Sequence, residues 1–364
     1  MAAGSTRKPR SGTSRQTGAP TIADVAALAG VSLMTVSRVI NAESAVRDAT
    51  REAVHAAIAK LNYAPNRAAR RLAGAAQLRI GLLYSNPSES YLSAFLLGSL
   101  EQASRADIQL VVQNVDGEGD EREVAQRLLK SGVDGIILPP PLCDSQPVLE
   151  LLSETRVPAV VVATARPPEK LAAVSIDDRS AAREMTTHLL DLGHQRIGFI
   201  IGNPNLTASS ERLEGYRDAL RARGLAVDEA LIAQGLFTYR SGLDAAEELL
   251  DIDHAPSAIF ASNDDMAAAT VAVAHRRGFD VPGDLTVVGF DDSALATTIW
   301  PELTTIHQPI ADMSRAAVDL LATMLRDKRS GGSEAARHVV LDYTLIRRQS
   351  DAAPRRRPAA RKRG

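Results

Sequence analysis

The chain has 364 residues but only one cysteine, Cys143, and no apolar run long enough to cross a membrane. A single thiol excludes an internal disulfide and any metal site built from cysteines, and it suits a reducing cytoplasm. A membrane-spanning helix needs about 20 mostly apolar residues, so we expect no membrane anchor. The first twenty residues are basic but have no apolar centre, unlike a secretory signal. We therefore expect a cytoplasmic protein.

The sequence also lacks the short motifs of common catalytic sites. Neither GxxxxGK[ST] nor GxGxxG occurs, so a nucleotide-binding loop of either kind is absent. His188, His194 and His307 do not have the spacing of metal ligands. Asp291 and Asp292 could imitate a pair of catalytic carboxylates, but adjacent residues on a loop rarely converge on one bond. We expect no enzyme activity, no metal and no cofactor.

Acidic and basic residues are unevenly distributed. Residues 1–79 carry 12 Lys and Arg against 4 Asp and Glu, residues 347–364 carry 8 against 1, and residues 80–346 carry 22 against 39. A basic head on an acidic body indicates a polyanionic partner for the head alone. We interpret residues 1–19 as a disordered basic arm and 347–364 as a disordered basic tail, which has no leucine heptads for a coiled coil.

The head has the pattern of three short helices within residues 20–63. Thr21 can cap the first helix, with Asp24 at the capping-box position. Gly30 suits a left-handed helix end, and Ser32 can cap the next helix only two residues later. Helices joined so tightly must cross steeply, as in a helix-turn-helix. A third helix is predicted over roughly residues 48–61, where apolar side chains recur at helical spacing.

The segment GVSLMTVSRVIN, residues 30–41, has no acidic residue. Three valines can form its buried stripe, and the opposite face is small and polar. Small side chains at a helix N-terminus let backbone N–H groups approach phosphate, which an acid would repel. We therefore predict that this helix contacts duplex DNA; the alternative is a small helical domain with a solvated face. The candidate contacts in the head are Thr21, Ser32, Leu33, Met34, Thr35, Ser37, Arg38 and Asn41.

Two stretches of the head, TIADVAALAGVSLMTVSRVIN and TREAVHAAIAKLNYAPNRAARRLAG, resemble the N-terminal region of LacI/GalR-family bacterial transcriptional regulators. The resemblance covers residues 21–74 and implies a hinge helix within 64–76 that folds on operator DNA. Leu72 matches the leucine that wedges between central base pairs, which kinks the duplex. A flexible linker is the alternative. The hinge residues expected to contact DNA are Asn66, Arg67, Ala69 and Leu72.

Residues 77–346 alternate apolar runs, such as RIGLLYS, DGIILPP and RIGFIIG, with amphipathic helical segments. Short buried strands separated by helices indicate parallel sheets covered on both faces. The segment is large for one such unit, so we expect an α/β body of two Rossmann-like lobes behind the all-α head. Ligands of such folds bind at the carboxyl ends of strands, here in a cleft between the lobes.

Polar residues that follow the predicted strands are candidates for ligand contacts. Carboxylate and amide groups can bind hydroxyl groups, a guanidinium can donate two hydrogen bonds, and an aromatic face suits the C–H groups of a sugar ring. An acid or amide at a strand end can instead cap the next helix, and this alternative stays open for Asn263 and Asp292. The candidate effector contacts are Ser85, Arg212, Phe237, Asn263, Asp291 and Gln308.

The body resembles the periplasmic-binding-protein-like effector domain of LacI/GalR regulators through GHQRIGFIIG, SSERLEGYRDAL, ASNDDMAAA, VVGFDDSALA and PELTTIHQP. The family pattern implies effector contacts at five of these positions, and His307 and Gln308 lie in the matching late crossover; the five are Ser85, Arg212, Phe237, Asn263 and Asp291. Ala163 stands where several sugar-responsive members carry Asp, so no particular sugar is implied. The segment SESYLSAFLLGSLEQA matches part of the family's dimer seam, and packing of its apolar residues on their own sheet is the alternative.

The predicted protein is a homodimeric, nucleoid-associated transcriptional regulator that binds a near-palindromic double-stranded DNA operator. We expect a repressor whose operator affinity changes when a small-molecule effector, a sugar, binds between the lobes. The alternatives are a nucleoside, purine or other metabolite as corepressor, or an activating role. A transport receptor could use the same body, but the basic head and the missing signal argue against it.

Overall fold

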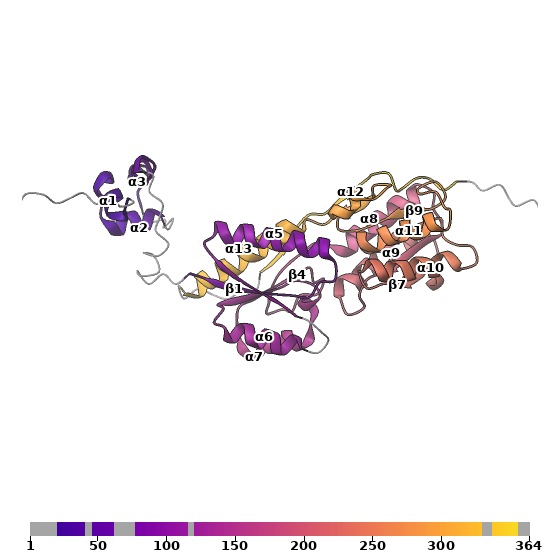
Figure 1. The fold of residues 1–364 in the computed structure, drawn as a ribbon, viewed down its shortest axis with the longest axis horizontal. Coiled ribbons are helices and arrows are strands. Elements are labelled where there is room, and N and C mark those ends of the chain that lie inside the picture. Colours follow the sequence, from indigo (N-terminus) through magenta and orange to yellow (C-terminus); the bar gives the residue numbers. More distant parts are fainter. Residues whose placement is uncertain (1–19, 41–45, 62–76, 116–119, 330–336, 356–364) are drawn as a thin grey trace, which may run out of the picture. The chain divides into compact units, whose positions relative to one another are not determined.

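The computed structural model describes residues 20–40, 46–61, 77–115, 120–329 and 337–355. The chain divides into two compact units, residues 1–77 and 78–364, which are each described by themselves (Figure 1). The predicted basic arm and hinge helix lie outside the described residues.

The first unit contains α1 (Ile22–Ala29), α2 (Leu33–Ile40) and α3 (Asp48–Leu61), which confirms the three predicted helices. Thr21 and Asp24 form a capping box, in which the Thr21 backbone N–H donates to the Asp24 carboxylate at 2.8 Å. Gly30 ends α1 in the left-handed conformation, with φ of 67°. The Ser32 hydroxyl then accepts from the Thr35 N–H at 3.1 Å and caps α2.

The three helices bury small apolar side chains against one another. The buried residues of this core are Val25, Ala26, Val36, Val39, Val54 and Ala57.

No single helix among the described residues is both long and apolar enough to cross a membrane. Helices α1 and α2 pass that test only together, and they are bent by 99° at their joint.

The first lobe of the second unit is a parallel six-stranded sheet in the order β11-β5-β4-β3-β1-β2. Helices α5 and α13 cover one face, and α6 and α7 cover the other (Figure 1). The strands are β1 (Arg79–Tyr84), β2 (Gln109–Asn114), β3 (Gly135–Leu138), β4 (Ala159–Val162), β5 (Ala172–Ser175) and β11 (His338–Val340). The helices are α5 (Glu89–Arg105), α6 (Glu121–Lys130), η1 (Leu142–Asp144), α7 (Gln146–Thr155) and α13 (Ile310–Arg329).

The second lobe has a parallel sheet in the order β7-β6-β8-β9, and β10 pairs with β12 in an antiparallel ladder. Two lobes with parallel sheets confirm the predicted fold class. The strands are β6 (Ile197–Ile201), β7 (Ile232–Gln234), β8 (Ala258–Ala261), β9 (Thr286–Val288), β10 (Thr305–His307) and β12 (Thr344–Ile346). The helices are α8 (Asp178–Asp191), α9 (Thr207–Ala222), η2 (Glu229–Leu231), α10 (Tyr239–Asp251), α11 (Asp264–Arg276) and α12 (Ala294–Thr298).

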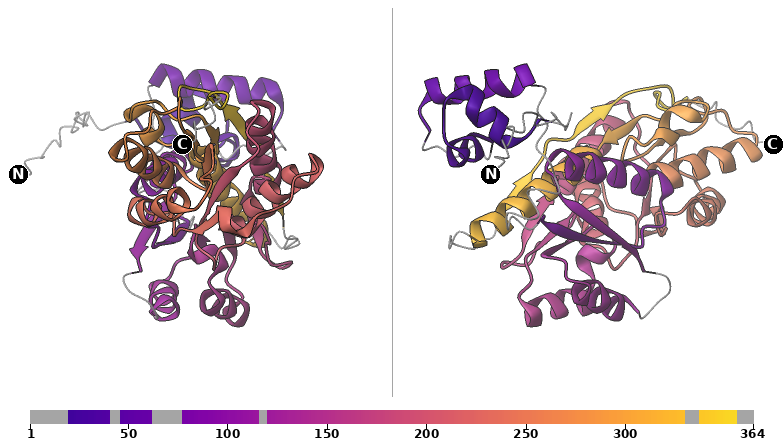
Figure 2. Two further views of the ribbon diagram at one scale, coloured as in Figure 1. Left: turned by 90° about the vertical axis from the view of Figure 1, so that its right-hand side faces the viewer. Right: turned by 60° about the vertical axis from the view of Figure 1, so that its left-hand side comes forward.

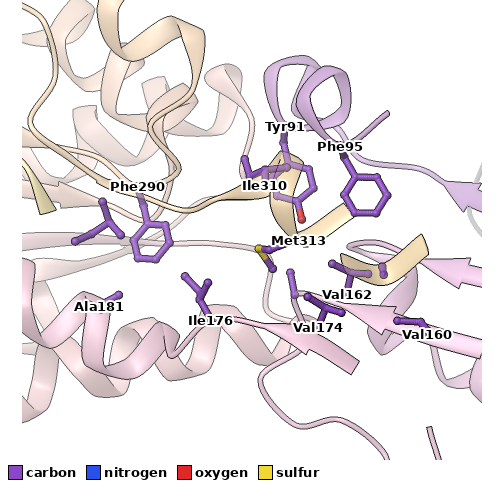
Figure 3. Packing of buried hydrophobic residues seen from close by; sticks show 14 of the residues in the cluster. Tyr91, Phe95, Val160, Val162, Val174, Ile176, Ala181, Phe290, Ile310 and Met313 are labelled. Carbon is purple, nitrogen blue, oxygen red and sulfur yellow. The ribbon is translucent and has the colours of Figure 1, made fainter. Parts of the chain in front are cut away.

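One hydrophobic cluster runs through both lobes. Phe95 of the first lobe belongs to the same cluster as Phe199 and Phe290 of the second. Figure 3 shows Tyr91 and Phe95 of α5 above Met313 of α13, with Phe290 further along the same row. The chain passes between the lobes after β5, before α13 and between β11 and β12, and Figure 2 shows the last of these crossings in yellow. Three crossings and a shared core make the lobes one body.

The predicted disorder of the basic tail does not hold for residues 347–355, which pack on the second lobe. The buried Ser350 hydroxyl accepts from the Thr304 N–H at 2.9 Å and donates to the Val287 carbonyl at 2.5 Å. The Asp351 carboxylate bonds to His188 Nε2 at 2.8 Å. The segment was predicted to be disordered from its many basic residues. Charge composition does not show that uncharged neighbours such as Ser350 form hydrogen bonds with backbone groups of the second lobe. Residues 356–364 lie outside the described part of the tail.

Candidate DNA-binding surface and effector cavity

Helix α2 presents a face that carries no acid and points away from the core of its unit. Val36 and Val39 are buried, whereas Leu33 and Met34 are 52% and 65% exposed. Arg38 is also exposed, and the first turn of α2 contains no acidic residue. The structure therefore gives α2 the two unlike faces that its sequence predicts.

The polar residues near this face differ in how they are held. Ser32 is exposed and its hydroxyl caps α2, while Thr35 and Ser37 are half-buried. The Thr21 hydroxyl donates to the Asp24 carboxylate at 2.7 Å. The Thr21 backbone N–H and this hydroxyl together hold the pKa of the Asp24 carboxyl below its usual value. Five candidate DNA contacts lie outside the described residues: Asn41, Asn66, Arg67, Ala69 and Leu72.

A cavity lies between the two lobes of the second unit, and its volume is about 550 Å³ when the solvent at its open mouth is included. Five of the six candidate effector contacts line it. The first lobe contributes Asn86, Ser88, Tyr91, Pro140, Pro141 and Ala163. The second lobe, with its crossing segments, contributes Leu206, Arg212, Phe237, Asn263, Asp291 and Gln308. Ser85 is half-buried and is not a lining residue, although its neighbours in the same loop are.

The Arg212 guanidinium is the most heavily bonded group of the cavity. It is only 5% exposed, and its Nε donates to Asp178 Oδ1 at 2.8 Å. Its Nη1 donates to the Ser262 carbonyl at 2.6 Å and its Nη2 to Gln308 Oε1 at 3.2 Å. The Phe290 ring lies beneath it, with 3.6 Å between the guanidinium carbon and the ring centroid. These contacts fix the direction in which Arg212 can donate.

Two buried carboxyl groups accompany Arg212. Asp291 Oδ1 lies 4.0 Å from Arg212 Nη1, and burial raises the Asp291 pKa well above its usual value despite that charge. Burial also raises the pKa of Asp178, whose Oδ2 has no hydrogen-bond partner among the described residues. The φ of Asp291 is 107°, in the left-handed region, and this unusual backbone is part of a loop that carries the carboxyl to the cavity.

Phe237 depends on a glycine for its place in the cavity wall. A Cβ at Gly202 would lie 1.9 Å from the Phe237 ring, so only glycine leaves room for the aromatic plate. Asn263 Nδ2 donates to the Phe237 carbonyl at 3.0 Å, and Asn263 Oδ1 accepts from the Met266 N–H at 3.0 Å. Asn263 is therefore both the N-cap of α11 and a lining residue.

The cap interpretation of Asp292 is wrong. Its carboxylate accepts from Arg348 Nη2 at 2.5 Å and bonds to His307 Nδ1 at 3.0 Å, while Ser293 occupies the N-cap position of α12. Asp292 thus joins the C-terminal segment to β10 and does not line the cavity. Its partner Arg348 belongs to the segment that was expected to be disordered.

Tyr91 is a cavity residue that the sequence interpretation missed, because its helical spacing indicates packing. Its ring packs in the core, but its hydroxyl has no partner among the described residues although it is buried. Burial raises its pKa well above the usual value, so the group stays a neutral donor and acceptor. The available signal was a tyrosine in the first turn of a helix that follows a strand end. Ala163, with φ of 58°, lies in the same wall and provides no polar side chain there.

Comparison with known proteins agrees with this two-unit architecture. The family of bacterial regulatory proteins, lacI family, matches residues 21–66, and the periplasmic binding protein-like domain matches residues 186–350. The HTH-type transcriptional regulator CelR of Thermobifida fusca is 37% identical over 338 residues, which are 91% of this chain and 98% of CelR. The HTH-type transcriptional repressor PurR of Photobacterium profundum is 33% identical over 314 residues, which are 85% of this chain and 92% of PurR.

Solved structures agree over the same length. A transcriptional regulator CelR–cellobiose complex has a TM-score of 0.70 at 36% identity and covers 91% of this chain and 99% of its own. A Lac repressor dimer bound to operator and the anti-inducer ONPF has a TM-score of 0.68 at 30% identity and covers 92% and 100%. These identities extend across both the helical head and the two-lobed body. The chain therefore belongs to the lacI family of bacterial regulatory proteins.

Proposed function

We propose that this transcriptional regulator is a dimeric repressor whose affinity for a near-palindromic operator changes when a small carbohydrate binds between its lobes. The observation that carries the proposal is the combination of two surfaces in one chain. One is the exposed, acid-free face of α2; the other is a cavity in which Arg212, Asp291 and Asn263 surround an aromatic plate. Because its target is the operator, the protein is expected to act in the cytoplasm on nucleoid DNA.

The α2 face suits the major groove. Arg38 can donate two hydrogen bonds to one guanine, which is worth about 1–3 kcal/mol of discrimination against another base. Leu33 and Met34 are exposed and suit thymine methyl groups. The phosphate contacts are assigned to Thr21, Ser32, Thr35 and Ser37, with Asn41 at the end of the same segment. The hinge contacts in the minor groove are assigned to Asn66, Arg67, Ala69 and Leu72.

The cavity suits a polyhydroxylated ring. Arg212 donates, the Asn263 amide oxygen can accept, Gln308 can donate or accept, and the raised pKa of Asp291 lets its carboxyl group do either. Phe237 provides a flat apolar face for C–H groups. Cellobiose in the CelR complex makes a β-linked glucoside the first ligand to try. For the ligand to regulate, it must bind one lobe arrangement more tightly, and a coupling of about 1–3 kcal/mol is usual.

A purine corepressor is the second candidate. The specific observation in its favour is the Phe237 ring in the lining of the cavity, because a flat base could stack on it. PurR is also among the relatives at 33% identity. Thermal-shift measurements with cellobiose, glucose, guanine and hypoxanthine show which class of ligand binds, and operator titrations with the bound ligand show the direction of its effect. A sugar effector stabilises the chain and releases operator, whereas a purine corepressor strengthens operator binding.

The dimer is proposed to form through α5. Tyr91, Phe95 and Gly98 face the interior, but Leu97 and Leu100 are 65% and 51% exposed. A second copy that covers these leucines would bury apolar surface that the described part of one chain leaves open. A Leu97→Glu, Leu100→Glu double variant should sediment as a monomer and bind a half-site. If the double variant is still a dimer, the dimer interface is not formed by α5.

The test of the regulatory function is selection of binding sites from a randomised duplex library. The wild type should enrich one near-palindrome, and Arg38→Ala should relax the preference at one base position in each half-site. Asp291→Ala should keep operator affinity and lose the response to the effector. Absence of any preferred duplex, with or without sugars and purines, contradicts the proposal. Chemical turnover of a bound sugar would instead indicate an enzyme.

A further inference from the structure

Two carboxylates join the lobes beside the cavity, and neither of them lines it. Asp144 belongs to the first lobe and bonds to the second, whereas Asp265 belongs to the second lobe and bonds to the first. Each one reaches the N-terminal turn of a helix of the opposite lobe. We call these two contacts the Asp144 clasp and the Asp265 clasp.

The Asp144 clasp caps α9, whose own N-cap residue makes no side-chain hydrogen bond. The N-cap position of α9 is Leu206, whose side chain cannot accept a hydrogen bond. Asp144 Oδ2 accepts instead from the backbone N–H of Thr207 at 2.8 Å and from its hydroxyl at 2.9 Å. Asp144 Oδ1 accepts from the Thr164 hydroxyl at 2.6 Å, which holds the carboxylate in its own lobe. A negative group at a helix N-terminus also interacts favourably with the helix dipole.

In the Asp265 clasp the carboxylate belongs to the second lobe and its partner belongs to the first. Ser88 is the N-cap of α5 in the first lobe, and its hydroxyl accepts from the Tyr91 N–H at 3.3 Å. The same hydroxyl donates to Asp265 Oδ2 at 2.7 Å, in the first turn of α11. Asp265 Oδ2 also accepts from Asn263 Nδ2 at 3.3 Å. The clasp therefore connects directly to two residues that line the cavity.

The joined helices carry the ligand-facing groups. Helix α9 holds Arg212, five residues after Thr207, and α5 holds Tyr91. Further contacts near the Asp144 clasp also cross between the lobes: Leu206 packs in a cluster of first-lobe residues, and Arg166 pairs with Glu211 at 2.7 Å. If the clasps open, the two walls of the cavity separate and a small ligand can contact only one of them.

We infer that Asp144 and Asp265 are positioning residues that hold the lobes close enough for one effector to contact both walls. The identity of the effector rests on the proposed function, but the clasps can be tested without any ligand. Removal of the helix cap that Asp144 supplies, or of the hydrogen bond that Asp265 accepts from Ser88, costs about 0.5–2 kcal/mol, which corresponds to a roughly 2- to 30-fold rise in the ratio of open to closed molecules.

The test is a distance measurement between spin labels on the two lobes of the full chain. Glu150→Cys on α7 and Asp244→Cys on α10 are exposed labelling positions, and the native Cys143 is buried. Asp144→Ala and Asp265→Ala should each add a longer distance, with the open-to-closed ratio about 2- to 30-fold higher. Asp120→Asn is the matched control, because Asp120 is exposed at the N-cap of α6 and makes no capping bond there.

Distance distributions of both clasp variants that coincide with the wild type overturn the inference, even if their unfolding temperatures fall. If Asp144→Ala does not fold, Thr207→Val provides the second test, because it keeps the backbone of α9 and removes a hydroxyl that contacts the first lobe at Asp144, Thr164 and the Ala165 N–H. It should lengthen the distance in otherwise wild-type protein, and an unchanged distance in this variant counts against the inference. Neither operator nor sugar is present, so a negative result here leaves the proposed regulatory function intact, and the reverse also holds.

Discussion

Asp264 should make the stability of the second unit depend on pH in the range where most carboxyl groups no longer titrate. It is fully buried at the start of α11, beneath the loop that carries Asp291. Its Oδ1 accepts from the Thr305 hydroxyl and its Oδ2 from the Ser293 N–H, each at 2.7 Å. Burial outweighs these bonds and raises the pKa of Asp264 to about 7.

The folded chain therefore binds this proton more tightly than the unfolded chain, in which the pKa is 3.8. The stabilising contribution of protonated Asp264 is fully present below that lower value and is lost as the pH rises through about 7. One pKa unit corresponds to about 1.4 kcal/mol, so the whole effect is about 4 kcal/mol. Between pH 5 and pH 8 the free energy of unfolding should fall by about 2–3 kcal/mol from this group alone.

Urea unfolding of the wild type and Asp264→Asn, followed by circular dichroism at pH 5, 6, 7 and 8, measures this loss. The amide cannot ionise; its oxygen can still accept from Ser293, and its NH₂ can donate to the Thr305 hydroxyl. Asp178 and Asp291 also have raised pKa values, but they titrate in both proteins; their effects cancel in the difference except for the part of the Asp291 shift that comes from the Asp264 charge. The Asp120→Asn control should follow the wild type. Stability curves of wild type and Asp264→Asn that stay parallel from pH 5 to 8 refute the reasoning.

Three other substitutions or deletions test separate parts of the chain. Thr21→Ala removes the capping box of α1 and should destabilise the first unit by about 1 kcal/mol, measured by hydrogen exchange; unchanged protection means the cap is dispensable. Gly202→Ala should displace the Phe237 ring and weaken effector binding at least tenfold while operator affinity stays constant; equal loss of both indicates general misfolding. Deletion of residues 347–364 should lower the unfolding temperature, whereas deletion of 356–364 should not; equal effects would contradict the packed segment.

The three helices of the head and most strands of the body follow from the sequence because their signals are local. Capping residues and helical spacing predicted α1, α2 and α3, and α3 has the predicted limits of 48 and 61. The long apolar runs predicted β1, β3 and β6, since a strand buried on both faces needs apolar side chains at every position. The short strands β7, β10 and β12 have three residues each, too few for any periodic pattern.

The cavity was partly predictable for a topological reason. Parallel strands bring their carboxyl ends to one edge, so polar residues after β8 and β9 had to lie near each other. This rule identified Asn263 and Asp291, and it indicated Arg212 and Phe237 on the elements that follow other strands; the family pattern supported these four and pointed to the late crossover that contains Gln308. It could not separate Ser85 from its neighbours Asn86 and Ser88, because the turn of the loop decides which of them faces inward. Tyr91 was missed because the helical spacing of apolar residues indicates that its ring is buried but does not show that its hydroxyl group lies at the cavity.

Contacts between the lobes depend on how two separately folded layers meet, which no local pattern encodes. Asp144 and Thr207 are 63 positions apart, and their bond requires both lobes to be in place. One local sign was nevertheless present. The segment NLTASSERL offers Thr207 and Ser209 as caps for α9, yet the helix begins after Leu206 and both residues lie inside it. When a helix starts before its best capping residues, its first N–H groups need an acceptor from elsewhere. In this chain the acceptor is on the other lobe, so the cap can form only when the cavity is closed.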